Sequence, residues 1–149
     1  MYDSPIVPRV SVIEAASPGE LAQVYAIRRR VFIEEQAVPA EIELDPDDAD
    51  ALHVLALEDS RAIGCGRMVA HGAEVKMGRM AVLPDRRRHG IGALILKFLI
   101  EAARQRGCHK AILHAQLHAE GFYLKYGFAP VGEVFEEAGI PHRRMERGL

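Results

Sequence analysis

A strand pattern, a proline, two closely spaced glycines and an amphipathic helix follow one another between residues 73 and 107, and this run constrains the fold most strongly. The segment AEVKMGRMAVL has the character of a strand and is closed by Pro84. Gly90 and Gly92 then precede an apolar stripe of helical period that continues for about four turns, with Gly107 suited to a left-handed cap. The stripe consists of Ile91, Leu94, Ile95, Phe98, Leu99 and Ala102. The helix is therefore predicted to be a crossover between this strand and the next apolar segment, KAILHAQ (110–116).

The start of this helix is suited to bind an anion. Its first N–H groups have no partner inside the helix, and the helix dipole adds partial positive charge there. Gly90 and Gly92 lack Cβ atoms, so a phosphate can approach the backbone closely. A solvated basic face is the ordinary alternative for the preceding RRRH (86–89). Neither a dinucleotide fingerprint, which needs a third glycine where Ile95 stands, nor a P-loop with Gly-Lys-Ser/Thr is present.

The remaining segments predict a single domain over residues 1–149 and an α/β (α+β) fold with a mixed, largely antiparallel sheet and helices on both faces. Ser17 and Glu20 form a capping box that opens a helix over 17–32. Residues 34–50 are acidic and carry two prolines, which predicts a short helix followed by a long surface loop. Further strands are predicted at 9–15, 51–58 and 61–71, a short helix at 119–127, and a closing hairpin-like pair from 129 onward.

Charge and composition exclude several classes of protein. The net charge of −2 argues against a nucleic-acid partner, and the lack of a run of about 18 apolar residues argues against a membrane partner. Cys65 and Cys108 form no disulfide framework and are expected to be buried thiols, and the N-terminus lacks the pattern of a signal peptide. These features predict a soluble cytoplasmic protein. Seven histidines occur without HExxH or CxxC spacing, and the pair His114 and His118 does not share a helix, so no metal site is predicted.

Two motifs resemble the signatures of the GNAT family of N-acetyltransferases. The stretch MGRMAVLPDRRRHGIGALIL is similar to its apolar strand, proline and Arg-x-x-Gly-x-Gly loop, with Arg87, Gly90 and Gly92 at the motif positions. The stretch AEGFYLKYGF resembles its Phe-Tyr-x-x-x-Gly-Phe signature, through Phe122, Tyr123, Gly127 and Phe128. The flanking segments 28–56 and 131–147 are similar to the small bacterial ElaA/YjcF-type subgroup, so the resemblance extends from Val10 onward.

The resemblance implies the GNAT fold, with a splayed central strand pair, and acetyl-CoA as the acetyl donor. Backbone amides of residues 88–93 would hold the pyrophosphate with Arg87 beside it, and Arg86 or Arg88 could meet the 3′-phosphate. The free strand edge near Met80–Val82 would pair with the pantetheine arm and supply an oxyanion donor. The cofactor-binding residues implied are Met80, Ala81, Val82, Arg87, Arg88, His89, Gly90, Ile91, Gly92, Ala93 and Tyr123.

The resemblance also implies that Tyr123 is the general acid that protonates the leaving thiolate, with Tyr126 as the local alternative. The general base is less defined by the sequence. Its candidates rank Glu35 and His53 first, followed by Glu34, Asp45 and His142. Relatives place an asparagine before the Phe-Tyr helix, whereas this chain offers Gln116 or His118.

Several alternatives stay open at this point. The acceptor is an amine of a small molecule, peptide or protein, and relatives of this size are often homodimers. The acidic run Glu41–Asp50 is either a solvated loop or an attractor for a cationic acceptor. Two other functions compete with acetyl transfer: a non-catalytic acyl-CoA-binding or regulatory module, and an acyltransferase similar to acyl-homoserine-lactone synthases. The Arg-x-x-Gly-x-Gly loop argues against the second of these.

Overall fold

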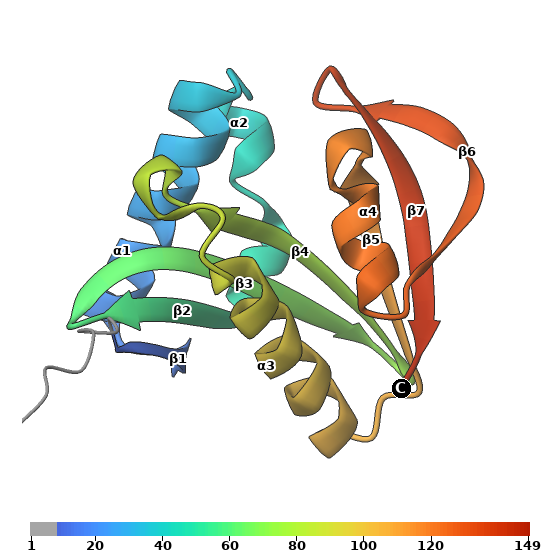
Figure 1. Ribbon diagram of the computed structural model, residues 1–149, viewed down its shortest axis with the longest axis horizontal. Coiled ribbons are helices and arrows are strands. Elements are labelled where there is room, and N and C mark those ends of the chain that lie inside the picture. The colour runs from blue at the N-terminus through green and yellow to red at the C-terminus, as the bar shows by residue number, and fades with distance from the viewer. Residues whose placement is uncertain (1–8) are drawn as a thin grey trace, which may run out of the picture.

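Seven strands form one mixed sheet in the order β1-β2-β3-β4-β5-β7-β6, with helices on both faces (Figure 1). The computed structural model describes residues 9–149; residues 1–8, part of the segment assessed for a signal peptide, lie outside it. The strands are β1 (Val10–Ala15), β2 (Leu52–Glu58), β3 (Arg61–His71), β4 (Glu74–Val82), β5 (Lys110–Gln116), β6 (Ala129–Glu137) and β7 (Ile140–Gly148). The helical segments are α1 (Pro18–Arg28), η1 (Arg29–Glu35), α2 (Ala40–Glu43), η2 (Pro46–Ala49), η3 (Pro84–Arg86), α3 (Ile91–Gln105), η4 (Leu117–Ala119) and α4 (Glu120–Lys125).

The first four strands pair in sequence order as an antiparallel meander, and α3 is the predicted crossover. Asp59 and Ser60, with φ of 46° and 74°, make the tight turn between β2 and β3. After α3, β5 returns parallel to β4, and β7 and β6 complete the sheet as an antiparallel pair. The capping box of Ser17 and Glu20 opens α1 as expected.

The sheet divides in the middle, between β4 and β5. These strands pair only from Glu74 to Met77 and from Lys110 to Leu113, and beyond this point they diverge like the arms of a V (Figure 1). A β-bulge lies just beyond the last pair, where Cys65 opposes Ala81 but Arg67 opposes Gly78. The bulge leaves one extra residue in β4. The edge of β4 consequently makes no pairing with β5 in the part of the strand where the sequence motif predicts the pantetheine site.

The helices α1 and α3 cover opposite faces of the sheet, each over its own apolar cluster. Gly64 and Gly66 allow α3 to approach β3, because a Cβ there would lie 2.9 Å and 2.8 Å from atoms of Ile95. The buried face of α3 differs from the predicted stripe, since Leu94 is 40% exposed. The buried residues are Ile91, Ile95, Leu96, Leu99, Ile100 and Ala103. Compared with the predicted stripe, the buried face is therefore rotated about the helix axis by about one residue.

The segment between α1 and β2 is more ordered than the predicted short helix and loop. The chain leaves α1 through a π-helical stretch, η1, and then forms α2 and η2, where Asp45 provides a second capping box with Asp48. Glu43 is 3% exposed, so this acidic segment is not simply a solvated surface loop. Within residues 9–149, none of the helices combines the length and apolar character needed to cross a membrane.

Candidate active site

A cavity of about 1070 Å³ occupies the opening between β4 and β5. It brings together residues 78–82 of β4, the start of α3, the end of β5, α4, and the segments around η1 and α2. Every residue that the sequence assigns to cofactor binding lines it, with the exception of His89. Its size is in the range of pockets that enclose a ligand larger than a typical drug.

The start of α3 has the geometry expected of an anion site. Gly90 is the N-cap with φ 78°, a left-handed conformation that favours glycine, and no side chain caps the helix. Arg88, with φ 67°, bends the preceding loop. A Cβ on Gly92 would lie 3.6 Å from Phe122 Cζ, which is an ordinary van der Waals contact. Packing within the protein therefore does not require glycine at this position. The residues present therefore fit a pyrophosphate on the backbone amides.

The three arginines of the loop differ in their partners. Arg86 forms an ion pair with Glu58. Arg87 makes a two-pronged pair with Glu35, with both N–O distances 2.7 Å, and its Nε donates to the Val82 carbonyl at 3.0 Å. Arg88 has no ion-pair partner among residues 9–149, which leaves its charge available for a phosphate.

The two base candidates ranked first lie in unfavourable settings. Both carboxylate oxygens of Glu35 accept from Arg87, and this hydrogen bonding lowers the pKa of Glu35, which makes it a weaker proton acceptor. His53 is 4% exposed, its Nε2 lies 2.9 Å from the Asp48 carbonyl oxygen, and it is outside the cavity lining. The structure thus joins Glu35 to the loop before α3 and leaves His53 outside the cavity, beside Tyr25 and Asp48.

Tyr123 lies on α4 and faces the opening of the sheet. Its hydroxyl donates to Met80 Sδ at 3.7 Å, and its ring packs edge-to-face on Phe122 and Phe128. Burial raises the pKa of Tyr123 to about 12, so the phenol keeps its proton at neutral pH. Tyr126, the alternative acid, instead packs on Phe122, and Lys97 lies over its ring at 5.8 Å.

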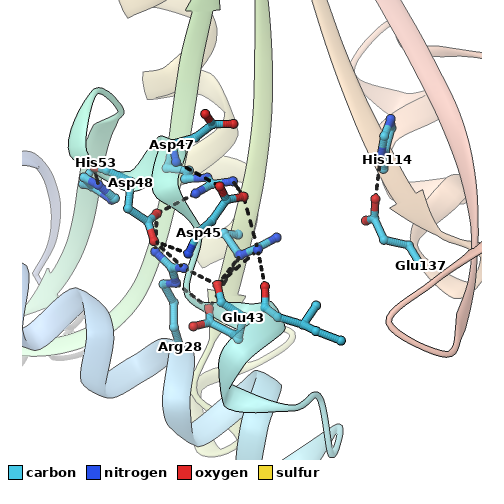
Figure 2. A network of polar contacts seen from close by, with 11 residues as sticks. Arg28, Glu43, Asp45, Asp47, Asp48, His53, His114 and Glu137 are labelled. Carbon is cyan, nitrogen blue, oxygen red and sulfur yellow. Dashed lines mark hydrogen bonds and ion pairs between the residues drawn. The ribbon is translucent and has the colours of Figure 1, made fainter.

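A buried ionic network fills the space beside the bulge of β4 (Figure 2). Arg28 is fully buried and contacts Glu43 at 2.5 Å and Asp48 at 2.8 Å. Arg67 bridges Asp48 and Asp45 at 2.5 and 3.0 Å. Three of the acidic side chains in segment 41–50 are thus matched by arginines. Neither sequence interpretation of this segment, solvated loop or free anionic attractor, describes them.

Arg79 connects this network to the bulge. It has φ 51°, a left-handed conformation that is uncommon for a residue with a side chain. Its guanidinium donates to the Glu43 carbonyl at 3.1 and 3.2 Å and lies 3.6 Å from the Glu43 carboxylate. The acidic segment therefore holds the irregular backbone that separates β4 from β5. No local sequence signal indicates these partners, which are 36 residues apart.

The opposite wall of the cavity carries His114, Glu137 and His142, of which only His142 was a candidate from the sequence. His114 Nδ1 lies 2.9 Å from Glu137 Oε1, and His142 Nε2 lies 3.7 Å from Glu137 Oε2. Gln36 and Gln116, which also line the cavity, exchange amide hydrogen bonds at 2.9 and 3.4 Å. Across residues 9–149, no group of His, Cys, Asp and Glu side chains has an arrangement suited to a metal ion.

Comparison with known proteins identifies the family to which the chain belongs. Residues 14–149 match the family described as the acetyltransferase (GNAT) domain. The chain belongs to this family. It is therefore a GNAT-type acyltransferase, and the fold predicted from the two motifs is confirmed.

The most similar relatives include the ElaA/YjcF-type proteins that the sequence resembles. The chain is 34% identical over 137 residues to the uncharacterized N-acetyltransferase YjcF of Bacillus subtilis (strain 168), covering 91% of this chain and 98% of YjcF. It is 32% identical over 136 residues to ElaA of Escherichia coli (strain K12), covering 85% and 88%. The crystal structure of Escherichia coli ElaA matches with a TM-score of 0.82 at 28% identity, over 95% of this chain and 99% of that one.

A more distant structure shares the fold alone. The PaiA N-acetyltransferase of Thermoplasma acidophilum, in complex with coenzyme A, matches with a TM-score of 0.72 at 16% identity, over 95% of this chain and 99% of that one.

Proposed function

We propose that this GNAT acyltransferase moves the acetyl group of acetyl-CoA to an amine acceptor, which attacks the thioester directly. The observation that carries the proposal is the continuity of one cavity. It joins the uncapped start of α3, the free edge of β4 and the partly buried phenol of Tyr123. Acetyl-CoA supplies the activated thioester, and the chain supplies binding, orientation and protons.

The donor half of the cavity has a group for each part of acetyl-CoA. Amides at the start of α3 would bind the pyrophosphate, and Arg88 is the cation available for a further phosphate. The unpaired edge of β4 at Met80–Val82 would accept the pantetheine arm as an added strand, and an N–H there would stabilise the oxyanion. The PaiA structure, which has the same fold, is a complex with coenzyme A, and this supports coenzyme A as the ligand class proposed here.

Tyr123 is proposed to protonate the leaving thiolate. Its raised pKa keeps the proton in place until negative charge develops beside it. A covalent acetyl-enzyme on cysteine is disfavoured, because burial raises the pKa of Cys65 to about 12 and Cys108 is 7% exposed. These two unpaired thiols also support a cytoplasmic location.

The proposal is tested by release of CoA thiol across a panel of polyamines, aminosugars, amino acids and peptides. We expect release above the rate of hydrolysis with at least one class of amine. Gly92→Glu places bulk and negative charge against the pyrophosphate and should abolish thiol release. Gly92→Ala makes only an ordinary contact with Phe122 and is the milder substitution at the same position. An absence of amine-dependent thiol release throughout the panel, in a protein that still binds acetyl-CoA, would favour the non-catalytic acyl-CoA-binding module.

A further inference from the structure

Two histidines and a glutamate form a polar cluster on the cavity wall that the donor site does not use. His114 comes from β5, Glu137 from the end of β6 and His142 from β7. The register of the sheet brings them together, because His142 pairs with Gln116 and Glu137 pairs with Ile140. Figure 2 shows His114 and Glu137 on the far side of the opening from the ionic network.

The hydrogen bonds assign the protons of both imidazole rings. His142 Nδ1 lies 2.6 Å from the Ile140 carbonyl oxygen, which can only accept, so this nitrogen carries the proton. In the neutral ring, Nε2 of His142 is therefore an acceptor. His114 Nδ1 donates to Glu137 Oε1 at 2.9 Å, and this bond lowers the pKa of Glu137, which is thus a carboxylate at neutral pH.

Two acceptors consequently face each other across a short gap. His142 Nε2 and Glu137 Oε2 are 3.7 Å apart, which is beyond hydrogen-bond length. A nitrogen with two N–H donors can lie about 2.9 Å from each of them at once. A primary ammonium has this geometry and a charge that complements Glu137. A hydroxyl has only one proton to donate and no positive charge.

The rings are held in place around this gap. Phe135 stacks on His142 with centroids 6.0 Å apart and contacts the edge of His114 at 5.0 Å. His142 is 6% exposed, whereas the Glu137 side chain is 42% exposed. Nearby charged groups include Lys76 on β4, which contributes to lowering the pKa of Glu137, and Arg143 and Arg144 on β7, which are paired with Glu120 and Glu146.

We infer that the acceptor binds as a primary ammonium between Glu137 and His142, and that His142 Nε2 removes its proton. This inference rests on the proposed acetyl transfer. The N–H bond of the ammonium breaks and its proton passes to His142. The freed amine attacks the thioester carbonyl, the C–S bond breaks, and the thiolate takes the proton of Tyr123. The attacking nitrogen loses its second proton to solvent as the amide forms. Solvent also receives the proton from His142 and returns one to Tyr123, so one proton is released in each turnover. His114 is a positioning residue that orients Glu137.

The pH dependence of His142→Ala tests the role of base. With an alkylamine near pH 7, we expect kcat/KM to fall by about 10²- to 10⁴-fold. The loss should shrink as the pH approaches the pKa of the amine, because free amine no longer needs a base. Added imidazole should restore part of the rate. His71→Ala, an exposed histidine outside the cavity, is the matched control. An equal loss at every pH without rescue, or no loss at all, would overturn the assignment.

Glu137→Gln tests the ammonium site with a partly exposed side chain, so the fold is not at risk. We expect KM for an alkylamine to rise at least tenfold, while the thermal shift given by acetyl-CoA stays unchanged. A weakly basic amine that is neutral at pH 7 should be acetylated by both variants at close to the wild-type rate. Equal losses for charged and neutral amines would refute the inference. If the wild-type protein turned over no amine, the proposed function would fail instead.

Discussion

Tyr123 shows how a single residue acquires its chemistry from its surroundings. Aromatic neighbours partly cover the phenol, and its only hydrogen-bond partner within residues 9–149 is the weak acceptor Met80 Sδ. Burial rather than a nearby charge raises the pKa to about 12. A general acid in this state stays protonated over the whole range in which amines are acetylated.

Replacement of Tyr123 by Phe removes the proton and keeps the ring packing. We expect kcat to fall by about 10- to 10⁴-fold with acetyl-CoA affinity unchanged. Because the folded pKa lies near 12, wild-type activity should show no loss from this group below about pH 11. Steady-state rates and a pH profile, with Tyr126→Phe as control, check this. A variant with full kcat would show that another group protonates the thiolate.

Sequence motifs point to residues that line one part of the cavity but not to those on its opposite wall. Gly90, Gly92 and Tyr123 lie in short local patterns, since helix starts and strand ends are specified by neighbouring residues. The contacts of His114, Glu137 and Arg79 depend on sheet register and on segments 23 to 36 residues away. Glu35, a base candidate from the sequence, lines the cavity, but its pairing with Arg87 depends on a contact across 52 residues.

At the scale of elements, the acidic segment and the bulge of β4 are one unit. Burial on its own raises the pKa of Asp48, but hydrogen bonds from Arg28 and Arg67 outweigh this and bring it to about 2. A carboxylate whose pKa is lower in the folded than in the unfolded protein stabilises the fold at pH values above its unfolded pKa. Its contribution of about 2 kcal/mol is lost as the pH falls from about 4 to about 2.

Asp48→Asn should therefore lower the free energy of unfolding by about 3 kcal/mol at pH 7, because it leaves buried arginines unpaired. The difference in the free energy of unfolding between this variant and the wild type should become smaller as the pH falls toward 2. Denaturant titrations at both pH values measure it. Asp85→Asn, in an exposed pair with Arg61, should have no measurable effect. A loss for Asp48→Asn that is independent of pH would contradict the ionic origin.

The contact between α3 and β3 gives a prediction of packing. A methyl group on Gly66 would lie 2.8 Å from Ile95 Cγ2, so the neighbour must move. Gly66→Ala should cost about 1–3 kcal/mol in the free energy of unfolding. Gly19→Ala meets nothing within 4 Å and should leave stability unchanged or slightly higher. Equal unfolding midpoints for both variants would show that α3 has room to shift.

For the whole molecule, the divided sheet makes the two arms depend on what lies between them. The central strands of the two arms pair only from Glu74 to Met77 and from Lys110 to Leu113, at the base of the arms. A ligand that pairs with β4 and contacts α4 would bridge the arms and bind only the folded state. Donor binding should therefore be visible as a global gain in stability.

Acetyl-CoA at a hundred times its Kd should stabilise the fold by about 2.7 kcal/mol, which corresponds to a rise in Tm of roughly 5–10 °C for a chain of this size. Differential scanning fluorimetry measures this shift. Gly92→Glu should show none, because the added carboxylate repels the pyrophosphate. A normal shift in that variant would place the donor elsewhere.

Transfer of a labelled acetyl group is the most direct test of acetyl-CoA as donor and an amine as acceptor. The protein is incubated with acetyl-CoA deuterated in its acetyl group and with a primary amine that supports release of CoA thiol. The masses of the products are then measured by mass spectrometry. The account predicts one deuterated N-acetyl group on the amine for each thiol released, and no acetyl group on the protein. Thiol release without labelled amide, or a stable acetyl-protein adduct, would contradict it.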